Sequence, residues 1–298
     1  MPGRRGRINS FFRAFLACTI ALPAWLAGSA DSRPNVSRPA DPALVERLVQ
    51  NQRAAMKRVE QYLFRQHALD ERLNEDRSVK RREEREEIVC FYDGVPLYKQ
   101  LVINGRATGQ RETDPWPSIK RDENWRKQVR RFDERRARYD RIIAEVPKAF
   151  SFTFEGEEAV DGHPATVYRL TPKPGYRATS RETEMLKHVT ARAWVDERAG
   201  HMLRLAATVE RDFDMWGGLL LKVHKGATYE LCQKPFQGMW LPYFAEERWS
   251  VRIGLFKFLG QHLRTERSDF RPNPLKIQFQ GELDAPRLLV QRRDCRQR

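Results

Sequence analysis

The chain has 298 residues, and its 55 Lys and Arg outnumber its 40 Asp and Glu, so that its formal net charge at pH 7 is +15. This length suits one large domain or two small ones. Beyond residue 30 no apolar run approaches the roughly 20 residues that a membrane-spanning helix needs, so this part of the chain is expected to be soluble. The basic balance suits nucleic acid, anionic lipid or other polyanions as partners, although a generally basic proteome produces the same charge.

Residues 1–30 predict a secretory signal peptide. Four arginines precede the apolar stretch "AFLACTIALPAWLAG", and small residues lead up to Ala30. We expect cleavage between Ala30 and Asp31, release into the periplasm, and therefore no nucleic-acid partner. A membrane anchor is the alternative, but the stretch is short and contains Pro23. Lipid attachment at Cys18 is disfavoured because the apolar stretch continues well past this residue.

A single domain is expected over residues 42–275, between a flexible leader at 31–41 and a C-terminal extension at 276–298. It begins with a helix, since Asp41 is a suitable N-cap, Pro42 suits the first helical position, and apolar residues follow at three- and four-residue spacing. A second helical segment, a charged insertion at about 115–147, carries an apolar stripe. Its arginines could bind anionic lipid, but the interleaved acids favour an ordinary solvated face.

The rest of the domain has the alternation of an antiparallel sheet. Asp93-Gly94 is a strong hairpin signal, and Asn104-Gly105 ends the second strand of that hairpin. The charged stretch before it fits a helix or a strand, and we favour a strand from about Arg81. Consecutive hairpins follow from residue 150, with apolar residues on one side, as in "VTARAWVDERAG". We predict an α+β fold, mainly antiparallel: a curved, incomplete β-barrel with helices on its concave apolar face.

Three cysteines remain after the predicted cleavage. Cys90 and Cys232 fall in predicted strands, whereas Cys295 lies in a polar tail. A Cys90–Cys232 disulfide is one expectation for an exported protein, and three unpaired thiols are the alternative.

No motif in the sequence indicates catalysis, a metal or a cofactor. Nucleophile-elbow, phosphate-binding, dinucleotide-binding and zinc-protease patterns are absent. The six histidines are scattered, and Glu155, Glu157 and Glu158 fit the solvated end of a hairpin better than an acid–base site. We therefore predict a protein that is not an enzyme.

Five stretches carry a resemblance to a known family. They are "FYDGVPLYKQLVINGR", "FEGEEAVDGHPATVYRLTPKPGYR", "ARAWVDERAGHMLRLAATVERDF", "GGLLLKVHKGATYEL" and "WLPYFAEERWSVRIGLFKFLGQHLRTERSDFR". Together they resemble the LolA/LolB-like superfamily of outer-membrane lipoprotein-sorting proteins. The likeness covers most of residues 45–275, and the long charged insertion departs from a minimal carrier. The resemblance implies a helix-lidded half-barrel whose apolar hollow holds acyl chains.

An uncovered apolar wall would favour lipid as its partner, since soluble proteins rarely leave such surface bare. The candidate lipid-binding residues are Phe150, Phe152, Phe154, Leu203, Leu205, Trp249, Val251 and Ile253, together with Trp216, Leu219, Leu220 and Leu221 from the apolar run "MWGGLLLKVHKG". Each wall residue taken alone is better explained as ordinary core between the sheet and the helices, whereas the set together describes a wall. The run at 215–226 is either a plug in the barrel mouth or an exposed tip that meets membrane or cargo.

Three functions fit these observations. The first is a monomeric, non-catalytic periplasmic carrier of lipids or lipoproteins toward the outer membrane. The second is an envelope sensor of the same fold that binds a membrane-protein partner. The third is an envelope scaffold whose arginines bind anionic head groups in a salt-dependent manner.

Overall fold

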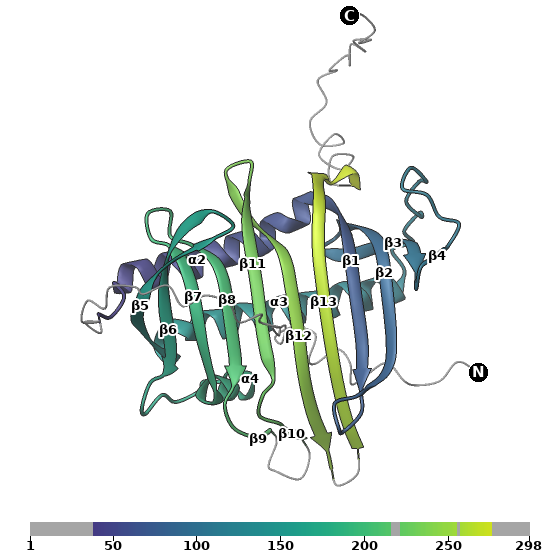
Figure 1. Cartoon of the computed structure of the whole chain (residues 1–298). Helices are drawn as coiled ribbons and strands as arrows, with labels where there is room; N and C mark the ends of the chain where they lie inside the picture. Colours follow the sequence, from purple (N-terminus) through teal and green to yellow (C-terminus); the bar gives the residue numbers. More distant parts are fainter. Residues whose placement is uncertain (1–37, 216–220, 255–256, 276–298) are drawn as a thin grey trace, which may run out of the picture.

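The computed structural model describes residues 38–215, 221–254 and 257–275, and its main feature is a 13-stranded antiparallel sheet. The strands run in the order β4-β3-β2-β1-β13-β12-β11-β8-β7-β6-β5, and the short β9 and β10 extend it beside β12 (Figure 1). Their bounds are β1 Tyr62–Leu73, β2 Val79–Tyr92, β3 Val95–Ile103, β4 Arg106–Ala107, β5 Phe150–Val160, β6 His163–Pro172, β7 Val189–Asp196, β8 His201–Val209, β9 Phe213–Met215, β10 Leu221–Val223, β11 Thr228–Phe236, β12 Met239–Ile253 and β13 Lys257–Pro272.

Tight turns join most neighbouring strands, and the turn residues are types that tolerate the backbone angles of a tight turn. Asp93 and Gly94, between β2 and β3, both have positive φ, which glycine tolerates freely and aspartate tolerates better than most residues. The strand predicted from about Arg81 is confirmed and starts slightly earlier, at Val79. Opposite charges alternate on one face of this strand, through Arg81, Glu83, Arg85 and Glu87, and Arg85 pairs with Glu83 at 2.5 Å.

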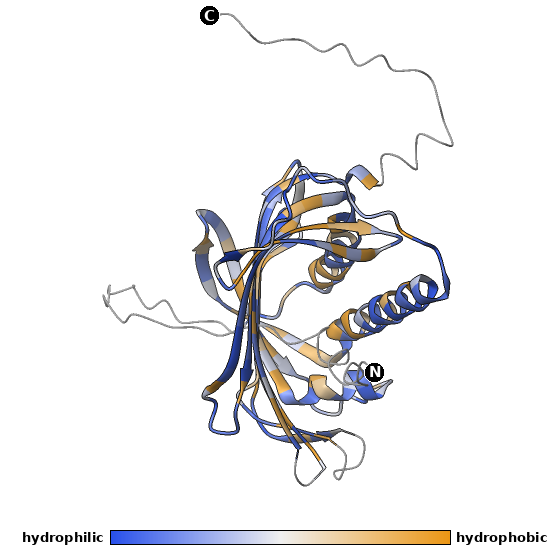
Figure 2. Ribbon diagram, turned by 90° about the vertical axis from the view of Figure 1, so that its right-hand side faces the viewer, coloured by the Kyte–Doolittle hydropathy of each residue, from blue (hydrophilic) through white to orange (hydrophobic). Residues whose placement is uncertain are grey.

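The first and last long strands pair in the middle of the sheet. β1 lies antiparallel to β13 from Tyr62–Pro272 to Leu73–Gly260. The sheet ends at β4 on one side and at β5 on the other, so it curves without closing (Figure 2). The predicted fold class, α+β with an incomplete antiparallel barrel, is therefore confirmed.

Helices cover one face of this curved sheet, here called the inner face (Figure 2). They are α2 Pro42–Arg58 with the 3-10 turn η1 Val59–Gln61, α3 Glu123–Ala149, and the short α4 Arg181–Glu184 with the turn η2 Met185–His188. Asp41 caps α2 as expected, because its carboxylate accepts from the Ala43 N–H at 2.9 Å. None of the described helices is long and apolar enough to cross a bilayer.

The second helix begins later than the sequence pattern suggested. Residues 115–121 are not helical, because Pro115 and Pro117 disfavour the helix there, and α3 starts after Asp122, whose carboxylate caps the Trp125 N–H. The preceding loop instead packs against the sheet, where Lys99 donates to the carbonyl oxygens of Glu112 and Asp114.

The structure contradicts the predicted disulfide. Cys90 and Cys232 are both free, buried thiols. They lie on β2 and β11, which β1, β13 and β12 separate. With neighbouring strands about 4.8 Å apart, four steps across the sheet span about 19 Å, far beyond the roughly 7 Å between Cα atoms that a disulfide allows.

The segment at 215–226 belongs to a long hairpin. β9 and β10 pair with each other, and Lys222 and Val223 of β10 also pair with β12. Leu221 and Val223 are buried in the main core. Residues 216–220, between β9 and β10 in the chain, lie outside the described residues, so the choice between plug and exposed tip is not tested. Residues 1–37, with the predicted cleavage site at Ala30 and Asp31, and residues 276–298 also lie outside them.

Candidate functional site

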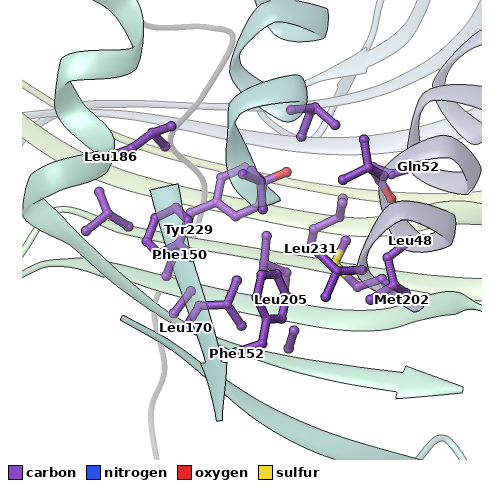
Figure 3. Close-up of a pocket in the computed structure, with 18 of the residues that line it drawn as sticks. Leu48, Gln52, Phe150, Phe152, Leu170, Leu186, Met202, Leu205, Tyr229 and Leu231 are labelled. Carbon is purple, nitrogen blue, oxygen red and sulfur yellow. The ribbon is translucent and has the colours of Figure 1, made fainter. Parts of the chain in front are cut away.

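An apolar hollow lies between the inner face of the sheet and the two long helices. Its volume is about 120 Å³, and its walls come from α2, α3, η2 and strands β5, β6, β7, β8 and β11 (Figure 3). The lining residues are Val45, Leu48, Val49, Gln52, Tyr139, Ile143, Val146, Phe150, Phe152, Leu170, Leu186, Val189, Ala191, Ala193, Val195, Met202, Leu205, Ala207, Tyr229 and Leu231.

Small side chains in the sheet leave the space that forms the hollow. Alternate residues of β7 point inward, so that Val189, Ala191, Ala193 and Val195 all line it, as the period-two pattern predicted. Ala191 pairs with Ala207 of β8 across the sheet, which places two methyl groups side by side. Larger residues at these positions would fill the hollow.

The opposite wall is formed by helix faces with a helical repeat. Val45, Leu48 and Val49 of α2 follow the i, i+3, i+4 spacing that puts residues on one face, and Ile143 and Val146 of α3 are three residues apart. Figure 3 shows Leu48 approaching the hollow from a helix, opposite Leu205 and Phe152 from the strands.

Polar groups gather where the hollow meets β11. Gln52 donates to the Tyr139 hydroxyl at 3.0 Å and accepts from Gln233 at 2.5 Å. Burial raises the pKa of Tyr139 to about 12, and burial also raises the pKa of Tyr229. Both hydroxyls therefore stay protonated at neutral pH and serve as neutral hydrogen-bonding groups.

Three of the candidate wall residues line the hollow: Phe150, Phe152 and Leu205. Phe154 is partly buried and packs against the same core without lining the cavity. Trp249 and Val251 are buried in that core, while Ile253 is partly buried beside it, all three on β12 rather than in the cavity wall. Leu221 is buried in the same core, and Trp216, Leu219 and Leu220 lie outside the described residues.

Leu203 does not share a face with Leu205, contrary to the simple alternation expected for this strand. The pairing of β7 with β8 shifts between Trp194 and Val195, because Trp194 pairs with Arg204 but Val195 pairs with Met202. This bulge turns Leu203 to the outer face, where it packs with Trp194 and Val167. Met202 takes the inner position and lines the hollow.

Sequence reasoning missed the helical half of the site. The apolar stripes of α2 and α3 were visible, but nothing local indicates which part of the sheet they cover. Ala191, Ala193 and Ala207 were recognised only as one-sided strand residues, although a run of alanines facing inward is a signal for space beneath a covering helix.

Comparisons with known proteins add likenesses at low identity. No family model and no curated protein matches the chain. Similar solved structures include a putative outer membrane lipoprotein-sorting protein domain from Vibrio parahaemolyticus, at 10% identity and a TM-score of 0.30, covering 77% of this chain and 94% of that one. They also include a DUF1329 family protein from Desulfovibrio piger, at 13% identity and a TM-score of 0.25, covering 79% of this chain and 95% of that one.

MucB, in the Pseudomonas aeruginosa MucA/MucB complex, is also similar, at 12% identity and a TM-score of 0.21, covering 78% of this chain and 98% of that one. The class that the sequence motifs resemble, lipoprotein-sorting proteins, is thus present among the similar structures. At these identities and TM-scores the likenesses carry no argument about ligand or partner.

Proposed function

We propose that this chain is a non-catalytic binding protein of the cell envelope that holds the acyl chains of lipids or lipoproteins in its hollow. The observation that carries this proposal is the composition of the wall: all but three of the lining side chains, Gln52, Tyr139 and Tyr229, are purely apolar or thioether groups. Such a surface gains free energy by covering hydrocarbon, about 0.8 kcal/mol for each buried methylene.

The size of the hollow limits what it admits in this conformation. Its volume of about 120 Å³ is close to that of engineered apolar cavities of about 150 Å³, which bind benzene. It therefore accepts the end of one acyl chain. Uptake of a whole chain requires α2 and α3 to move away from the sheet and expose more of the inner face.

The polar groups of the hollow favour binding over catalysis. A general base works best with a pKa near the operating pH, whereas the two tyrosines in the wall have raised pKa values. Within the described residues there is also no cluster of His, Cys, Asp and Glu that could hold a metal ion.

Lipid extraction tests the proposal directly. We expect protein purified from its own host to carry acyl lipid that organic solvent releases and mass spectrometry identifies. After delipidation it should bind a fluorescent fatty-acid probe. Lipid-free protein that also fails to bind the probe would rule out this function.

An alternative role, binding a membrane-protein partner, draws on the exposed side of α3. Arg126, Lys127, Arg130 and Arg131 are exposed on this 27-residue helix. A complex with one envelope protein that forms equally well with delipidated and lipid-loaded protein would favour this role over carriage.

A further inference from the structure

The inner face of the sheet has a polar part beside the apolar hollow. It lies on β13, β1 and β2, where Arg267 pairs with Gln66 and Gln66 pairs with Glu87 in the strand register. All three side chains belong to the inner face, because Gln66 alternates with the outer-face residues Arg65 and His67. This places a guanidinium group inside the half-barrel.

The contacts of Arg267 hold the guanidinium without neutralising it. Its Nε donates to the Gln66 side-chain oxygen at 3.1 Å, and its guanidinium carbon lies 5.1 Å from the centre of the Phe64 ring. Among the residues that the structure describes, no carboxylate lies within ion-pair distance of Arg267, and no protein acceptor binds its two terminal nitrogens.

The acid in the register row of Arg267 is Glu87, and it contacts Gln66 and Arg85 instead of Arg267. Glu87, which is buried, accepts a hydrogen bond from the Gln66 amide at 2.7 Å and lies 3.6 Å from Nε of Arg85. The Gln66 amide therefore stands between the carboxylate and Arg267, with its nitrogen toward Glu87 and its oxygen toward the guanidinium. This arrangement orients Arg267 and leaves its two terminal nitrogens available to a ligand.

Arg267 is near the hollow as well as partly buried. Burial lowers the pKa of its guanidinium, with Tyr98 and Tyr229 acting against this effect. Tyr229 lines the hollow, and the charge of Arg267 in turn opposes the burial that raises the pKa of Tyr229. A charge that is partly removed from water and has no counter-ion is costly, and an anion from the ligand would relieve this cost.

We propose that Arg267 forms an anion subsite that binds the carboxylate or phosphate group of an amphipathic ligand whose acyl chain occupies the hollow. This inference rests on the proposed function and specifies its ligand as an anionic lipid. The planar guanidinium presents paired N–H groups that match two oxygens of a carboxylate or phosphate. Gln66 and Phe64 position the group, and Tyr229, which interacts electrostatically with it, is part of the wall of the hollow.

Equilibrium dialysis of palmitate against hexadecanol tests the subsite, because the two probes have the same chain length and differ in charge. We expect wild-type protein to prefer palmitate. Arg267→Gln should weaken palmitate binding about tenfold to a hundredfold and leave hexadecanol binding unchanged. Arg267→Lys should keep part of the preference, since a positive charge remains. Arg264→Gln, an exposed arginine of the same strand on the outer face, is the matched control and should bind as wild type.

The outcomes separate this inference from the function on which it rests. Binding of neither probe to wild-type protein removes the proposed function. Equal binding of both probes by wild type and Arg267→Gln overturns the anion subsite while the acyl-chain site stands. Unchanged hexadecanol binding by Arg267→Gln also shows that the variant is folded. Lysophosphatidylglycerol and inorganic phosphate, as competitors of palmitate, then distinguish a lipid phosphate from a free anion as the natural group.

Discussion

At the scale of single residues, His262 on the outer face has a carboxylate partner on each ring nitrogen. Its Nδ1 lies 2.8 Å from a Glu71 oxygen and its Nε2 lies 2.6 Å from a Glu246 oxygen. All three side chains are buried, and they come from neighbouring strands β1, β13 and β12. The hydrogen bonds to Glu246 and Glu71 raise the pKa of His262, against the effects of burial and of Arg248.

This clamp predicts a pH-dependent stability. Because the pKa of His262 is raised in the folded state, the interactions of this residue add to the free energy of unfolding. This stabilisation is fully present below the unfolded-state pKa of about 6.5 and is lost as pH rises through the folded-state pKa. His262→Gln should lower the free energy of unfolding by about 1–3 kcal/mol at pH 6. The difference from wild type should narrow toward pH 9. Urea unfolding across this range measures it.

The comparison with the variant isolates His262 from other histidines. Burial lowers the pKa of His188 and His201 in the folded state. The free energy of unfolding that these two residues contribute is therefore lowest in acid and increases as pH rises from their folded-state pKa to the unfolded-state pKa. Glu230, whose pKa is raised by burial and by Glu246, lies opposite Glu246 on the neighbouring strand β11. A wild-type-minus-variant difference that stays constant with pH would contradict the clamp.

Chemical labelling checks the two buried thiols. Burial raises the pKa of Cys90 and of Cys232 to about 12, so very little thiolate is present at neutral pH. We expect iodoacetamide to leave both residues unmodified in the folded protein and to modify both in denaturant. Peptide mass mapping distinguishes this result from a disulfide-linked Cys90–Cys232 peptide pair.

At the scale of elements, α3 contacts the rest of the protein near its start, in its middle and near its end. Near its start the Trp125 side chain is buried, donates to Asp93 at 3.1 Å, and packs on Tyr92 with ring centres 5.6 Å apart. In its middle, Arg136 reaches Glu60 of η1 at 2.8 Å. Ile142 and Ala149 are buried near its end.

This anchoring predicts local opening on removal of the tryptophan. Trp125→Ala should increase hydrogen exchange in residues 123–138 while residues 142–149, which pack on the core, stay protected. Trp125→Phe retains the packing on Tyr92 but loses the hydrogen bond, and should show a smaller increase. Uniform loss of protection along the helix would mean that α3 unfolds as one unit.

At the scale of the whole molecule, the small inward residues of β7 and β8 decide how much ligand the protein accepts. Ala193 lines the hollow and pairs with Leu205 across the sheet. A larger side chain there occupies space that an acyl chain would take. The same position is buried, so the added hydrocarbon is also covered.

Ala193→Phe should therefore abolish binding of a fluorescent fatty-acid probe, measured by titration, while the circular dichroism spectrum stays folded. Overpacking typically costs about 1–3 kcal/mol, which calls for a parallel thermal unfolding curve. Thr208→Phe, on the outer face of β8, is the control and should bind normally. A folded Ala193→Phe protein with full probe binding would place the ligand elsewhere.

Much of the local structure follows from the sequence alone. The inward set Val189, Ala191, Ala193 and Val195 was predictable because side chains alternate strictly along a regular strand. The Asp93-Gly94 turn and the Asp41 cap were predictable because each depends on residues only a few positions apart. The prediction that Leu203 lies on the inner face was wrong because a bulge breaks the alternation of β8. No residue type in this strand indicates that bulge.

The sequence by itself determined most of the one-sided strands, their hairpins and the start of α2, since these depend on short-range sterics and hydrogen bonds. Only the tertiary structure decided which strands meet at long range and which helices cover them. Arg267 and Gln66 are 201 positions apart in the chain, yet the pairing of β1 with β13 makes them neighbours. That pairing separates Cys90 from Cys232 and brings a charged group beside an apolar hollow, because register between distant strands is set by the packing of the whole sheet.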